Sequence, residues 1–89
     1  MTDDQCRSLL VEILADIAPE AELEPVPADA NLRTELDLDW LDFLSLIEGV
    51  RVRTGVTIPE RDYGQLVSIS DWTGYLTTRT AVGGATSSL

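Results

Sequence analysis

One stretch predicts the fold of this chain best: Glu35-Leu36-Asp37-Leu38-Asp39-Trp40-Leu41-Asp42-Phe43-Leu44. Asp39 has the side chain of a helix N-cap, because its carboxylate can accept a hydrogen bond from a free backbone amide of the first turn. We therefore predict a helix from Trp40 to about Arg53, which Gly55 ends. Phe43 and Trp40 are expected to lie together on the surface of one turn. The buried side of this helix is expected to comprise Leu41, Leu44, Leu46 or Ile47, and Val50.

A first helix is predicted near the N-terminus. Thr2 and Gln5 match a capping box, in which each side chain bonds the backbone amide of the other residue. Pro19 disfavours helical geometry at Ala18 and ends the helix there. One apolar stripe follows the three- and four-residue spacing of a helix: Cys6, Leu9, Leu10, Ile13, Leu14 and Ile17.

Residues 19–38 form a long connection with three prolines and no sustained periodicity. A loop of this length inside a compact domain is usually functional or contains a missed element. Asn31–Leu36 is predicted to form a single helical turn. Leu32, Leu36 and Leu38 are expected to pack into the core and hold the connection across the end of the bundle.

The last third of the chain predicts a connector, a short turn and a final helix. Val56-Thr57-Ile58 is read as a tight connector because Pro59 follows it, and 60–64 as a short helical turn. A last helix is predicted to start near Ser68 and to bury Ile69, Trp72 and Leu76. We expect an all-α, small four-helix bundle with three longer helices and one short one, formed by residues 1–79, and a disordered tail over 80–89.

Composition limits the possible functions. The chain has 89 residues and a formal net charge of −10, and residues 1–48 hold 13 carboxylates against Arg7 and Arg33. Nucleic acid and membrane surfaces are therefore poor partners, since both are anionic, and a protein with a basic patch is favoured. A membrane-spanning helix needs about 20 consecutive apolar residues, and we find no such run in this sequence. We expect a cytoplasmic monomer.

The sequence offers little for catalysis or for metal binding. It has no histidine, and Cys6 lies on the apolar stripe of the first helix. The sequence therefore lacks the side chains that catalytic triads and transition-metal sites need, so we expect neither an enzyme nor a metal site. Asp37, Asp39 and Asp42 leave a weak calcium site as an alternative, although their spacing differs from an EF-hand loop.

The stretch around Trp40 resembles the prosthetic-group site of acyl and peptidyl carrier proteins. Supporting features are the Ile58-Pro59 connector after the second long helix and the order of the elements over residues 2–79. The resemblance implies an Asp-Ser-Leu sequence whose serine carries 4′-phosphopantetheine, and Trp40 stands at that serine. It also implies docking of biosynthetic enzymes on helix 40–53, through Asp39, Leu41, Asp42 and Glu48. Asp37, by its charge, and Phe43, beside Trp40, are further partner-binding residues that we expect from the sequence itself. Arg51 and Arg53 depart from the acidic pattern of that helix.

Three interpretations of Trp40 remain open. The chain is an acyl carrier protein of fatty acid, polyketide or related biosynthesis that cannot be phosphopantetheinylated as written, because its serine has been replaced. Alternatively, it is a naturally non-carrying relative that binds proteins, with Trp40 as an anchor. In the third interpretation Trp40 only covers the edge of the core. No cofactor is expected as written, and Ser45 is not expected to replace the missing hydroxyl, because it lies in mid-helix.

Overall fold

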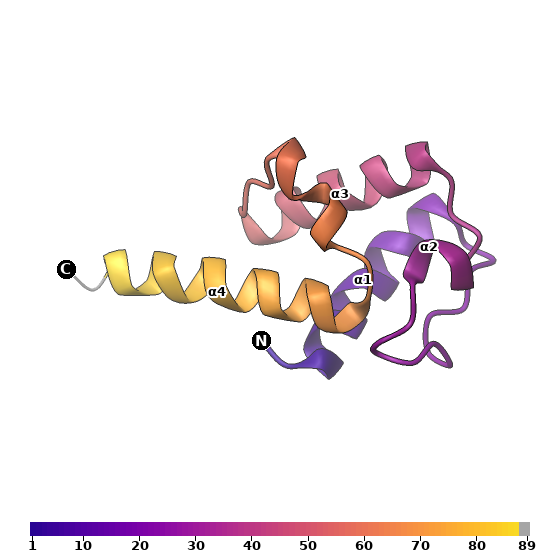
Figure 1. Cartoon of the computed structure of the whole chain (residues 1–89), viewed down its shortest axis with the longest axis horizontal. Coiled ribbons are helices and arrows are strands. Elements are labelled where there is room, and N and C mark those ends of the chain that lie inside the picture. Colours follow the sequence, from indigo (N-terminus) through magenta and orange to yellow (C-terminus); the bar gives the residue numbers. More distant parts are fainter. Residues whose placement is uncertain (88–89) are drawn as a thin grey trace.

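The computed structural model describes the backbone of residues 1–87 and the side chains of residues 1–79 (Figure 1). Its elements are α1 (Asp3–Ile17), α2 (Leu32–Glu35), α3 (Trp40–Thr54), the 3-10 helix η1 (Glu60–Gln65) and α4 (Ile69–Ser87). Residues 1–87 contain no strand, so the all-helical prediction is confirmed. None of the helices in this part of the chain is long and apolar enough to cross a membrane.

Helix α1 begins as its capping box predicts. The Gln5 amide donates to Thr2 Oγ1 at 3.1 Å, and the Thr2 amide donates to Gln5 Oε1 at 2.9 Å. The helix ends at Ile17, and the Ala18 amide still donates to the Leu14 carbonyl at 2.8 Å. Its buried face contains Cys6, Leu10, Ile13 and Leu14. Because α1 contacts both α3 and α4, this face is the centre of the core.

Helices α1 and α3 approach closely at a glycine. A Cβ atom on Gly49 would lie 2.5 Å from Ile13 Cγ2, much closer than two carbon atoms tolerate. The absence of a side chain at Gly49 therefore permits the spacing of these helices. At the end of α3, Gly55 adopts a φ of 75°, the left-handed conformation that glycine accepts without strain. The predicted stop of this helix is confirmed.

The long connection between α1 and α3 is ordered by one arginine. Arg7 Nη1 donates to the carbonyl oxygens of Leu23 at 2.9 Å and Val26 at 2.7 Å, and more weakly to that of Glu24 at 3.4 Å. Leu23 and Val26 are themselves buried. The connection is thus fixed to α1 through its backbone as well as through its apolar side chains.

The predicted turn in this connection is the short helix α2. Asn31 caps it, accepting a hydrogen bond from the Thr34 amide at 3.2 Å. Leu32 and Leu38 are buried, and Leu36 packs against the core as a partly exposed residue. The inward packing that the sequence predicted for these leucines is therefore confirmed.

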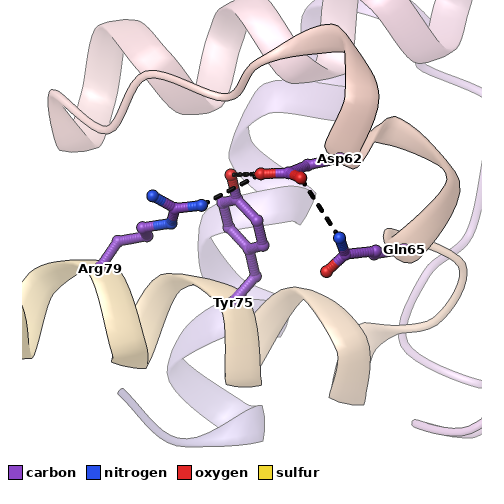
Figure 2. A network of polar contacts seen from close by, with 4 residues as sticks. All are labelled: Asp62, Gln65, Tyr75 and Arg79. Atoms are coloured by element: carbon purple, nitrogen blue, oxygen red, sulfur yellow. Dashed lines mark hydrogen bonds and ion pairs between the residues drawn. The ribbon is translucent and has the colours of Figure 1, made fainter.

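A buried carboxylate joins η1 to α4 (Figure 2). Asp62 Oδ2 accepts from the Tyr75 hydroxyl at 2.7 Å and from Arg79 Nη2 at 3.0 Å. Gln65 Nε2 donates to the other oxygen at 3.2 Å. Since a buried charge needs such partners, this network fixes α4 against η1.

Helix α4 begins after Ser68 as predicted, with a reciprocal cap between Ser68 and Asp71. It then continues beyond Leu76, and its backbone is helical to Ser87, where it projects past the rest of the molecule (Figure 1). The expectation of a disordered tail over 80–89 thus differs from the described backbone of 80–87. A helix can continue without an apolar stripe, because its backbone hydrogen bonds are internal. The domain limit of 1–79 stays a prediction.

Candidate functional site

The candidate site is the first turn of α3, which Asp39 caps. The Asp42 amide donates to Asp39 Oδ1 at 2.8 Å, and Asp42 Oδ2 accepts from the Asp39 amide at 3.4 Å. This reciprocal cap was predicted in part, since the sequence analysis named Asp39 and not the return bond from Asp42. Trp40 is the first residue of the helix, as predicted.

The indole ring of Trp40 belongs to an aromatic cluster. Its centroid lies 5.5 Å from that of Phe43 and 6.2 Å from that of Tyr63 in η1. The rings of Phe43 and Tyr63 meet edge to face, with centroids 6.0 Å apart. These separations are typical of attractive aromatic pairs. The cluster therefore joins the start of α3 to η1.

Arg33 of α2 also lies against this cluster. Its guanidinium carbon lies 5.5 Å from the centroid of the Trp40 ring and 5.3 Å from that of Phe43. Both distances fall within the range of cation–π attraction. Trp40 is thus held by residues of three elements, while 46% of its surface stays exposed.

A groove of about 370 Å³ runs beside Trp40, between the start of α2, the first turn of α3, and η1. Its lining includes Arg33, Trp40, Phe43, Tyr63, Leu66 and Val67. Leu66 and Phe43 are buried, whereas Val67 is 40% exposed. The floor of the groove is therefore apolar and belongs to the core, and its rim reaches solvent.

Two predictions about the orientation of α3 are wrong. Phe43 is only 3% exposed, so it does not share an open surface with Trp40, and Leu41 is 71% exposed rather than buried. The buried residues are Phe43, Leu46, Ile47 and Val50, while Leu44 is intermediate. Apolar residues occupy both faces of this helix, and the spacing alone does not select between them.

The acidic residues named from the sequence differ in their surroundings. Asp37 and Asp39 are exposed, and Asp42 is half-buried by its capping role. Glu48 bonds Arg51, whose Nε lies 2.9 Å from Glu48 Oε2, and this hydrogen bond lowers the pKa of the Glu48 carboxyl. The charge of Glu48 is thus largely compensated within α3, whereas Asp37 and Asp39 have no ion pair in the described structure.

The two arginines that depart from the acidic pattern are also paired. Arg51 binds Glu48, and Arg53 Nη1 lies 2.9 Å from Glu12 Oε2 of α1. Neither is therefore a free cation on α3. Within the residues that the structure describes, Asp37, Asp39 and Asp42 do not form a group that could hold a metal ion.

Four neighbours of Trp40 were not predicted from the sequence: Arg33, Tyr63, Leu66 and Val67. Three of them come from η1 and the segment after it, which the sequence separates from Trp40 by the whole of α3. No local pattern links these positions. An arginine before an acidic stretch and a tyrosine beside a glycine are common surface features, so only the tertiary structure shows that they meet.

The chain is similar to known proteins over most of its length. A family profile described as "phosphopantetheine attachment site" matches residues 8–76. An acyl carrier protein of Campylobacter hominis is 30% identical over 73 residues, which cover 82% of this chain and 86% of the relative. With the helical fold, these matches show that the chain belongs to the phosphopantetheine attachment family, the acyl-carrier-type domains.

Proposed function

We propose that this chain is an acyl-carrier-type domain that takes no phosphopantetheine arm at position 40 and acts by binding proteins. Trp40 supports the proposal most directly. Resemblance to the family assigns the attachment oxygen to this position, and an indole ring has no hydroxyl to form a phosphodiester. The residues at the site therefore do not fit the prosthetic group.

The surroundings of Trp40 favour a binding role for the ring. A tryptophan that merely replaced a small serine would have no reason to meet complementary partners, yet this ring contacts Phe43 and Tyr63 and lies under Arg33. About half of it faces solvent. Tryptophan in such a partly exposed, well-supported position is typical of residues that dominate binding energy at interfaces.

The docking surface that we propose comprises Asp37, Asp39, Leu41 and Asp42 around Trp40. Leu41 is the most exposed large apolar side chain in the described structure. The carboxylates around it would attract a basic partner at long range, so association should slow as ionic strength rises. Glu48 contributes less, because Arg51 compensates its charge. We propose that the protein binds as a monomer in the cytoplasm.

A second candidate function is an acyl carrier of fatty acid, polyketide or related biosynthesis whose serine has been lost. The intact cap between Asp39 and Asp42 favours it, because the first turn of α3 retains the geometry in which free amides face an incoming phosphate. In this case the site differs from one that can carry the arm at position 40 alone.

Arm loading tests both candidates. The purified chain is incubated with a phosphopantetheinyl transferase and coenzyme A, and its intact mass is measured. We expect no change for the unaltered chain. The Trp40→Ser variant distinguishes the candidates: loading of this variant supports the carrier that lost its serine, and failure to load supports the binding module. Loading of the unaltered chain would contradict both.

A further inference from the structure

We infer that the groove beside Trp40 binds a protein segment in which one apolar side chain is flanked by lysine or arginine. This inference rests on the proposed function and names the partner of the same site. It extends the proposed docking surface into the space between α2, the first turn of α3, and η1.

The groove has the size and the lining for one apolar side chain. Its volume of about 370 Å³ lies at the lower end of the range for ligand pockets, about 300–1,000 Å³. The floor is formed by Phe43 and Leu66, which are 3% exposed each, and the wall by Trp40 and Tyr63. An inserted aliphatic or aromatic side chain would therefore cover apolar surface that solvent now reaches at Trp40 and Val67.

The rim of the groove selects the charge of the partner. Glu60 lines it, and Asp39, an exposed carboxylate, directly precedes Trp40 in the chain. The one cation of the lining, Arg33, already lies over the rings of Trp40 and Phe43. Cationic residues of a partner would meet the carboxylates, whereas an acidic segment would be repelled.

The same charges argue against other occupants. A second copy of this chain would bring a net charge of −10 against an equal charge, and nucleic acid would be repelled in the same way. A basic protein segment is the occupant whose charge and apolar content both match.

The groove differs from an incidental surface depression because the Trp40 ring that lines it is held in place. Trp40 is supported by Phe43, Tyr63 and Arg33, so its ring is held in place before a partner arrives. Affinity then does not require the ring to be ordered on binding, which is the usual advantage of a preorganised anchor.

A peptide titration followed by NMR tests the inference. The probe is a short peptide with a central leucine and two lysines on each side, added to the ¹⁵N-labelled chain. Matched peptides carry alanine instead of leucine, or glutamate instead of lysine. We expect the Trp40 indole N–H and the amides of Tyr63 and Val67 to shift with the leucine peptide. Affinity should be about tenfold lower for the alanine peptide and lost for the glutamate peptide.

Variants of the chain locate the binding. Trp40→Ala should weaken binding of the leucine peptide at least tenfold, on the order expected for an interface tryptophan. Val67→Ala, on the rim, should weaken binding of the leucine peptide by a smaller factor. This variant replaces Trp40→Ala in the test if Trp40→Ala does not fold. Val52→Ala is the matched control, since Val52 is an exposed valine of α3 outside the groove and should leave affinity unchanged.

Several results would overturn the inference. They are equal affinity for the leucine and alanine peptides, an equal loss in Val52→Ala, and the absence of shifts at Trp40. Arm loading, which decides the proposed function, is not measured in this titration. A chain that takes no arm and ignores the leucine peptide would contradict only the role of the groove.

Discussion

The Tyr75 hydroxyl donates a 2.7 Å hydrogen bond to Asp62 Oδ2 and thereby joins α4 to η1 (Figure 2). Tyr63, which supports Trp40, follows Asp62 directly in η1. The bond therefore fixes the element that supplies one wall of the groove. Stability of α4 and shape of the groove are linked through this short helix.

Replacing Tyr75 by phenylalanine should lower the free energy of unfolding. The change removes the hydroxyl that bonds a buried carboxylate, a loss of about 1.5–3 kcal/mol. It keeps the ring under Arg79, whose guanidinium carbon lies 4.7 Å from the ring centroid. Urea unfolding measures the effect. Tyr63→Phe is the control, because the Tyr63 hydroxyl has no hydrogen bond to the side chains or backbone that the structure describes; an equal loss there would contradict the account.

The contribution of Tyr75 to the free energy of unfolding should decrease at alkaline pH. Burial, followed by the hydrogen bond to Asp62, raises the pKa of Tyr75 above its ordinary value of about 10. The unfolded chain then loses this proton at lower pH than the folded chain. The stabilisation is fully present below about pH 10 and is lost as pH rises through the folded-state pKa.

Urea unfolding of the natural chain and of Tyr75→Phe, compared at pH 8 and above pH 10, measures this dependence. The difference in unfolding free energy between the two should shrink at the higher pH. Cys6, whose pKa burial also raises, contributes equally to both chains. A difference that stays constant would show that the hydroxyl titrates alike in both states, and one that grows would show a folded-state pKa below the unfolded one; either contradicts the account.

Gly49→Ala should destabilise the chain by about 1–3 kcal/mol, the usual range for overpacking a core. The new methyl group would lie 2.5 Å from Ile13 Cγ2. Ile13→Leu in the same chain should recover part of the loss, because leucine has no methyl group on Cβ. Gly74→Ala is the matched control in α4: its Cβ would meet nothing within 4 Å, and helix propensity should add about 0.5–1 kcal/mol. Thermal unfolding of all four chains measures the order, and equal effects at Gly49 and Gly74 would refute it.

Arg7→Met should loosen the connection between α1 and α2. Methionine keeps much of the apolar stem and loses the donors to the carbonyl oxygens of Leu23 and Val26, at a cost of about 2–3 kcal/mol. Hydrogen exchange of residues 19–31 should rise more than that of α3. Arg61→Met, at an exposed position of η1, is the control and should change neither stability nor exchange. Unaltered exchange in Arg7→Met would mean that the apolar side chains alone hold the connection.

The sequence predicted the helix ends better than it predicted their faces. The caps at Thr2 and Asp39 and the stop at Gly55 depend on one side chain and the backbone beside it, so local rules suffice. The buried face of α3 depends on which of two apolar stripes meets α1. That choice is made by the close approach at Gly49, which no local pattern reveals.

The candidate site was predicted in its position and not in its surroundings. Trp40 begins α3 as expected, because the cap that precedes it is a local signal. Its contacts with Arg33 and Tyr63, and the bonds of Arg7 and Asp62, join residues far apart in the chain. Long polar and aromatic side chains reach many neighbours, and only the packed fold selects among them.

Intact-mass spectrometry of the chain produced in cells together with a phosphopantetheinyl transferase tests the central claim most directly. The account predicts one species with the mass of the bare polypeptide. A second species, heavier by one phosphopantetheine arm, would contradict it, and fragmentation would then identify the hydroxyl that carries the arm.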